Sequence, residues 1–358
     1  MKCPYTKGVP NPAFVSRYHE EVGEAYENSK GTISYRLKWD HNYDLEKFVY
    51  EQESRGRVFM VKPFLEVPCG KCAICMSNRK QEWIFRLKQE LDVSCAAVFV
   101  TLSYDDLHLP FRDKEGNYYR LSDTPLYNEE EAHQSLCKRD IQLFMKRLRK
   151  QTDAMISKYQ AKNLVCPIGM PRFYLVGEYG GKHQRPHYHA ILFNIPHWPV
   201  GSYDPYLFIG NIWHQGNISI GPVNGRVLNY VVSYMDLKKE KPHEFSEDQF
   251  CLMSRRPGIG ANYLEKSHIK SYYDYEKLKD NNVLVSMDGL KMPMPTYYKN
   301  KIYNDYDKLK KRVHDVVHPE SVSDQDYEIL KQKRKQTIVK EKILLERAIK
   351  RKNIFNKN

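Results

Sequence analysis

Runs of apolar residues in the middle of the chain predict a set of β-strands. Each is about the length of a strand in a globular protein and is bounded by turn-forming residues. Gly180 and Gly181 allow a turn between two of them. The expected strands are at residues 96–102, 173–179, 187–193 and 217–220.

Apolar residues at helical spacing predict the elements between the strands. Ile141, Phe144, Met145 and Leu148 recur at i, i+3, i+4 and i+7, with basic residues on the opposite face. An earlier helix is expected over residues 78–91, capped by Ser77. No nucleotide-binding glycine pattern accompanies these elements, and we predict an α+β fold in which helices flank an antiparallel sheet.

Two histidines and a carboxylate are candidate metal ligands. His187 and His189 lie two positions apart on an expected strand, so their side chains share one face. Glu178 ends the preceding strand, and the glycine turn would bring it beside the histidines. Such a ligand set leaves metal positions open for a substrate, although ordinary strand histidines are common.

A third motif contains two tyrosines. Tyr230, Tyr234 and Lys238 recur every four residues, so on a helix they share one face. Leu228, Val231, Val232 and Met235 form a separate apolar stripe, so the tyrosines are not needed for burial. The alternative is an aromatic pair that packs on the helix surface.

These motifs together resemble the HUH endonuclease superfamily, and more closely the replication initiation proteins of gokushoviruses, small single-stranded DNA phages of the Microviridae. Tyr188 stands at the hydrophobic position between the two histidines. The resemblance runs from about Cys69 to Tyr306. The matching stretches are residues 99–106, 176–180, 187–189, 230–238 and 253–260.

The resemblance implies a site-specific nuclease that cuts and rejoins single-stranded origin DNA. Glu178, His187 and His189 would hold Mg²⁺ or Mn²⁺. Tyr230 and Tyr234 would alternate as nucleophiles that form a 5′-phosphotyrosine bond. The histidine strand precedes the tyrosines, as in rolling-circle initiators.

Lys238 is expected to favour the ionised form of the tyrosines. No phosphate-binding loop of ATPases occurs in the chain, so a host helicase and the host replication machinery are expected partners.

The charge of the chain points to a polyanionic partner. Its 358 residues carry a formal net charge of +13, so nucleic acid is the first candidate and an anionic membrane surface the second. Residues 331–358 contain eleven Lys or Arg against two Glu and predict a basic helical tail. Arg185, Arg255 and Arg256 are candidate contacts to DNA.

A cluster of cysteines near the start of the chain suggests a second metal. Cys69, Cys72 and Cys75 form a C-x2-C-x2-C run, for which zinc is more plausible than a disulfide in a reducing compartment. Cys3 is the expected fourth ligand of this zinc-knuckle-like segment. Thiols without a metal remain the alternative, and an iron–sulfur cluster is a further one.

The length suggests an N-terminal region over residues 1–92, an endonuclease domain over 93–270 and a basic, Tyr-rich, helical region over 271–358. No signal peptide or membrane span is apparent, so we expect the bacterial host cytoplasm. A transposase of the same superfamily and a non-enzymatic DNA-binding protein are the alternative functions. The origin sequence, the order of the tyrosines and the oligomeric state cannot be deduced.

Overall fold

The computed structural model describes the chain in several stretches. These are residues 6–10, 23–27, 33–37, 50–54, 57–61, 64–122, 132–234, 241–266, 269–279, 283–304 and 307. Cys3, Lys238 and the basic tail lie outside them. Within the described ranges, no helix combines the length and the apolar character needed to cross a lipid bilayer.

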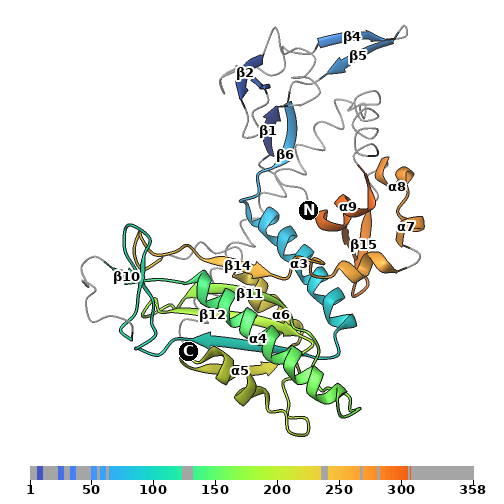
Figure 1. Cartoon of the computed structure of the whole chain (residues 1–358). Coiled ribbons are helices and arrows are strands. Elements are labelled where there is room, and N and C mark those ends of the chain that lie inside the picture. Colours follow the sequence, from blue (N-terminus) through green and yellow to red (C-terminus); the bar gives the residue numbers. More distant parts are fainter. Residues whose placement is uncertain are drawn as a thin grey trace.

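The first described strands form three antiparallel pairs. They are β1 (Thr6–Pro10) with β6 (Phe64–Pro68), β2 (Gly23–Glu27) with β3 (Ile33–Leu37), and β4 (Tyr50–Ser54) with β5 (Arg57–Val61). The polar, mixed-charge sequence there predicts no such strands. They lie beyond the first turn of helix α3 (Ala73–Val93), which β6 directly precedes (Figure 1).

A five-stranded sheet forms the centre of the molecule. Its strands, in spatial order, are β13 (Ile218–Pro222), β7 (Ala97–Ser103), β12 (Pro186–Phe193), β11 (Arg172–Tyr179) and β14 (Phe250–Met253). All neighbours in it are antiparallel, which confirms the predicted antiparallel sheet. The apolar runs place four of these strands to within two residues.

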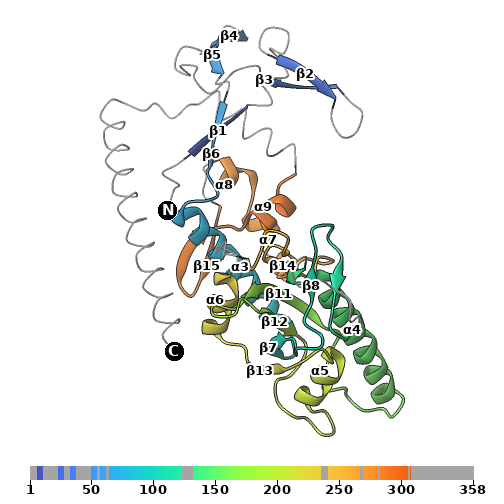
Figure 2. The ribbon, with the colours of Figure 1, turned by 90° about the vertical axis from the view of Figure 1, so that its left-hand side faces the viewer.

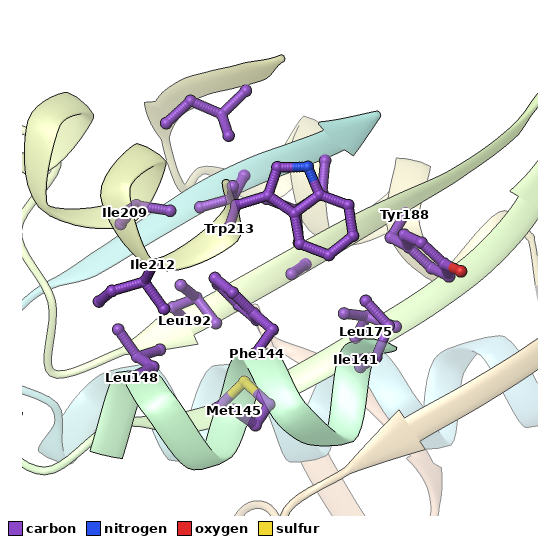
Figure 3. Packing of buried hydrophobic residues seen from close by; sticks show 14 of the residues in the cluster. Ile141, Phe144, Met145, Leu148, Leu175, Tyr188, Leu192, Ile209, Ile212 and Trp213 are labelled. Carbon is purple, nitrogen blue, oxygen red and sulfur yellow. The ribbon is translucent and has the colours of Figure 1, made fainter. Parts of the chain in front are cut away.

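One face of the sheet is covered by helices α4 (Lys138–Gln160) and α5 (Pro205–Trp213). Strand β7 alternates regularly, and its buried residues Val98, Val100 and Leu102 belong to this core. Phe144 of α4 and Trp213 of α5 meet edge to face, with ring centroids 5.9 Å apart. Figure 3 shows these side chains between the two helices and the strands.

The opposite face is covered by α3 and α6 (Gly225–Ser233) (Figure 2). Their apolar residues make a second core with side chains of β11 and β12. Its buried members are Ile84, Leu87, Tyr174, Val176, Ile191, Phe193, Leu228, Val231, Val232 and Ile259. Because alternate residues of a strand face opposite sides, β11 and β12 contribute to both cores.

Helix α3 also contributes to a third core, formed with the chain after residue 260. Phe85 packs edge to face on Tyr263 and Tyr298, and Tyr273 and Tyr298 are themselves buried. The elements of this region are the 3-10 helix η2 (Ala261–Glu265), α7 (Ile269–Tyr272), α8 (Tyr275–Lys279), the hairpin of β15 (Leu284–Met287) and β16 (Leu290–Pro293), and α9 (Thr296–Ile302). Many of the tyrosines there are thus core residues.

A short segment, Pro257–Gly260, joins α3 to the sheet. Arg172 of β11 forms an ion pair with Glu90 of α3 and donates to the carbonyl oxygens of Pro257 and Gly258 at 3.0 and 3.1 Å. Gly260 has a φ of +73°, and a Cβ there would lie 2.5 Å from the Arg86 carbonyl oxygen. Only glycine fits this contact.

Three elements differ from the sequence prediction. Helix α3 begins at Ala73 and not at Asn78, because the Cys72 side chain accepts a hydrogen bond from Cys75 N and caps the helix earlier than Ser77 would. Helix α5 and edge strand β14 were not predicted. The loop after β7 contains the short strands β8 (Phe111–Arg112), β9 (Tyr118–Tyr119) and β10 (His133–Gln134).

Candidate active site

The three predicted metal ligands meet on one face of the central sheet. Glu178 of β11 lies directly opposite His187 of β12 in the strand register, and His189 follows two residues along. The Nε2 atoms of His187 and His189 lie 2.9 and 3.0 Å from the same Glu178 Oε1. The three ligand atoms therefore lie within 4.8 Å of one another.

The other ring nitrogens determine which atoms are available to a metal. His187 Nδ1 lies 3.1 Å from the carbonyl oxygen of Arg185, which only accepts, so Nδ1 carries the proton. In the neutral ring, Nε2 then presents its lone pair to a carboxylate oxygen. Two atoms that both carry lone pairs repel at this distance unless a cation lies between them or the ring is protonated.

His189 has a comparable partner on its far side. Its Nδ1 lies 3.0 Å from Thr101 Oγ1 of β7, the residue directly across the strand pair. If the ring donates to this hydroxyl, its Nε2 is also a ligand atom. A hydrogen bond of this kind on the outer nitrogen is the usual way in which proteins orient metal-binding histidines.

The burial of these groups also fits a cation. Glu178 is 2% exposed and His189 5%, and an ionised carboxylate at such a depth requires a nearby positive charge. One carboxylate oxygen and two imidazole nitrogens form a donor set suited to Mg²⁺ or Mn²⁺, of which Mn²⁺ accepts nitrogen ligands more readily. The residues present thus fit the predicted ion.

The two tyrosines approach the same place from α6. Asn224 caps this helix by accepting from Arg226 N and Val227 N, both at 3.0 Å, and the apolar side of the helix packs on the second core. This leaves Tyr230 directed at the ligands, with its hydroxyl 3.3 Å from His189 Nε2. Tyr234, the C-cap residue, stacks on the His189 ring with centroids 5.2 Å apart.

The electrostatics of the tyrosines favour their neutral forms. Burial raises the pKa of both hydroxyls, and the negative charge of Glu178 adds to the effect. A hydrogen bond with Tyr234 lowers the pKa of Tyr230 and raises that of its partner. Positive charge at the ligand cluster would offset the contribution of Glu178 and make ionisation easier.

A cavity of about 390 Å³ adjoins His187 on the side away from α6. Its lining includes the polar residues Thr101, Ser103, Lys182, His183, Arg185 and His187. Arg185 donates to the Tyr104 carbonyl oxygen at 3.0 Å and pairs with Asp106 at 2.7 Å, so its guanidinium is fixed at the cavity. Of the predicted DNA contacts, this one lies beside the ligands.

The other predicted DNA contacts lie elsewhere. Arg255 and Arg256 are exposed and follow β14, whose Met253 pairs with Tyr174 at the end of β11 remote from Glu178. The structure does not bring them to the cluster. Lys238 falls outside the described residues, as does Cys3. The remaining cysteines Cys69, Cys72 and Cys75 do come together, at the start of α3.

The site also contains residues that were not selected from the sequence. Thr101 is the main one, and its signal is a polar residue on the face of β7 that alternation assigns to the histidines. Lys182 and His183, in the turn between β11 and β12, are exposed at the cavity. A basic residue in the turn that joins two ligand strands would have identified them.

Comparisons with known proteins concern this same part of the chain. The family model of the replication-associated protein ORF2 matches residues 97–240, a stretch that includes the ligand cluster and both tyrosines. Replication-associated protein VP4 of Bdellovibrio phage phiMH2K is 26% identical over 246 residues, which is 65% of this chain and 66% of that protein.

A second similar protein is Replication-associated protein ORF2 of Spiroplasma virus 4. It is 27% identical over 299 residues, which is 74% of this chain and 81% of that protein. The match to the phiMH2K protein thus spans just under two thirds of its length. No solved structure gives a significant match.

Proposed function

The chain belongs to the replication-associated proteins of the Microviridae, and on that premise we propose that it initiates rolling-circle replication by nicking single-stranded origin DNA. The observation that carries the proposal is the position of the Tyr230 hydroxyl, 3.3 Å from Nε2 of the metal-ligand candidate His189. A nucleophile beside a cation site is the arrangement that phosphoryl transfer needs.

In the proposed reaction, Glu178, His187 and His189 hold one divalent ion. Bound there, Mg²⁺ or Mn²⁺ supplies Lewis-acid polarisation of the scissile phosphate. The chain then supplies a tyrosine oxygen, which forms a bond to phosphorus while the bond from phosphorus to the 3′ oxygen breaks. The tyrosine proton is lost to solvent and the 3′ oxygen takes up a proton, which leaves a 3′-hydroxyl and a 5′-phosphotyrosine.

The second tyrosine allows the strand to be cut again and rejoined. Tyr230 and Tyr234 have rings 4.9 Å apart and both contact His189, so each can serve the same ion. We assign the first cut to Tyr230, whose hydroxyl contacts a ligand and whose side chain is 37% exposed to an incoming strand. Lys238 remains a predicted aid to ionisation.

The cavity beside His187 is the proposed path for the DNA backbone. Lys182 and Arg185 line it, and cations of this kind fix the register of a strand by contacts with phosphates. Binding is therefore expected to weaken as salt concentration rises. Unwinding of the duplex is assigned to a host helicase.

A covalent-adduct assay tests the proposal. Purified protein is mixed with single-stranded candidate-origin DNA and Mn²⁺, boiled in denaturant and separated on a gel. A protein–DNA band is expected that disappears with EDTA, in His189→Ala and in the double Tyr230→Phe, Tyr234→Phe variant. Tyr272→Phe is the matched control, because Tyr272 is an exposed tyrosine of α7, and it should retain the band.

The single variants order the two nucleophiles. Tyr230→Phe is expected to lose the first cleavage and Tyr234→Phe to retain it. Equal loss in both would contradict the assignment of the first cut. Tight, salt-sensitive binding without an adduct on any candidate origin would replace the nuclease with a non-enzymatic DNA-binding protein.

A further inference from the structure

Three cysteines at the start of α3 gather their sulfur atoms far from the tyrosines in the sequence. Cys69 follows β6, Cys72 is the N-cap of α3 and Cys75 lies in its first turn. The Sγ atoms of Cys69 and Cys75 are 3.9 Å apart, and all three lie within 4.8 Å of one another. Gly70, with a φ of +73°, allows the tight turn that folds Cys69 back over the helix.

Backbone donors surround these sulfur atoms. Lys71 N and Cys72 N lie 3.4 and 3.3 Å from Cys69 Sγ, and Cys75 N lies 3.5 Å from Cys72 Sγ. Hydrogen bonds of this kind stabilise a thiolate more than a thiol. The first turn of a 21-residue helix adds positive potential at the same place. The local backbone thus favours deprotonated cysteines.

The distances agree with a tetrahedral thiolate site. Zinc–sulfur bonds are about 2.3 Å long, so two sulfur ligands of one zinc ion lie about 3.8 Å apart. The Cys69–Cys75 separation is close to this value, and the remaining separations require only small rotations of the side chains. Soft thiolate donors select zinc over the magnesium or manganese expected at Glu178.

We propose that Cys69, Cys72 and Cys75 bind one zinc ion through their thiolates, at a second metal site that is independent of the nuclease chemistry. The ion would join the end of β6 to the first turn of α3. That helix packs on α6 through the second core and carries Phe85 of the third core. The zinc would therefore stabilise the point from which both packings begin.

The test measures metal content and coordination in the full-length protein. Protein purified without chelators is expected to contain about one zinc ion per chain by elemental mass spectrometry. Replacement of the zinc by Co²⁺ should give tetrahedral d–d bands and a near-ultraviolet sulfur-to-cobalt charge-transfer band. His189→Ala should keep both signals, because thiolates alone produce the charge-transfer band.

Variants connect the signals to these residues. Cys72→Ser is expected to lose the zinc and the charge-transfer band, whereas Cys95→Ser, at an exposed cysteine outside the cluster, should keep them. The Co²⁺ spectrum of the wild-type protein decides the matter even if Cys72→Ser fails to fold. Zinc content far below one per chain together with no charge-transfer band, or unchanged signals in Cys72→Ser, would overturn the proposal.

Discussion

Replacing Thr101 by valine tests whether the ligand cluster binds a metal, because it removes one hydroxyl and almost no volume. The His189 Nδ1 to Thr101 Oγ1 hydrogen bond, 3.0 Å long, selects the ring tautomer whose Nε2 is a ligand. Without it, the ring gains by moving its proton to Nε2 and donating to Glu178 Oε1, 3.0 Å away. That tautomer cannot bind a cation.

The size of the effect follows from the geometry. A neutral hydrogen bond contributes about 1 kcal/mol, and a buried N–H that faces a methyl group costs about 1–3 kcal/mol. His189 is only 5% exposed, so water does not readily take the place of the hydroxyl. The expected weakening of Mn²⁺ binding is therefore about 10- to 100-fold, in line with outer-sphere partners in other metal proteins.

The assay is calorimetric titration of Mn²⁺ into the DNA-free protein, with His189→Ala as the variant that lacks the site. Ser103→Ala is the matched control. Ser103 lies two residues further along the same face of β7, but its hydroxyl donates to the Asn217 carbonyl oxygen at 3.2 Å and to no histidine. Wild-type affinity in Thr101→Val, or an equal loss in Ser103→Ala, would refute the reasoning.

Three further predictions concern stability. Tyr188→Phe removes a fully buried hydroxyl that accepts from Cys137 N at 2.9 Å, so the free energy of unfolding in urea should fall by about 1–3 kcal/mol. Mn²⁺ binding should be retained, because Tyr188 faces the first core; a loss of binding at unchanged stability would contradict this. Gly260→Ala should lower the urea midpoint by more than about 1 kcal/mol of stability, since its Cβ would meet the Arg86 carbonyl oxygen at positive φ; an unchanged midpoint would show that the segment is not tightly packed. Burial raises the pKa of Tyr179 to about 12, whereas an unfolded tyrosine titrates near 10. Its stabilising contribution is thus complete below pH about 10 and is lost as the pH rises toward 12, so the urea midpoint should fall from pH 9 to pH 11.

Much of the central domain could be predicted because its strands and helices have strong local patterns. The apolar runs of β7, β11 and β12 are long, and the His187–His189 alternation states which side chains share a face. Pairing then brings Glu178 opposite His187, which makes the cluster a consequence of register. The sequence order of the motifs was enough to suggest the tyrosines as partners.

The elements that escaped prediction depend on contacts distant in the sequence. Strand β14 has only four residues and exists through its pairing with β11. Helix α5 is apolar on several sides, so its periodicity is weak, and its signal was the Asp204 cap followed by Pro205. The role of Thr101 required knowing that β7 and β12 are neighbours.

The two parts of the proposed active site differ in how firmly they are held. The ligands lie on β11 and β12, and each of these strands has a hydrogen-bonded neighbour on both sides. The tyrosines lie on and next to a nine-residue helix that apolar side chains hold against the sheet and α3. Displacing a ligand means breaking strand pairing, whereas α6 can shift by sliding its packed side chains.

A reaction that cuts a strand, holds it and later rejoins it needs an ion that stays in place and a nucleophile that can be exchanged. Four residues of helix advance the chain by about 6 Å, so one tyrosine can take the place of the other through a small displacement of α6 or of the DNA. The rigid sheet would then keep the charge at the phosphorus constant through both cuts.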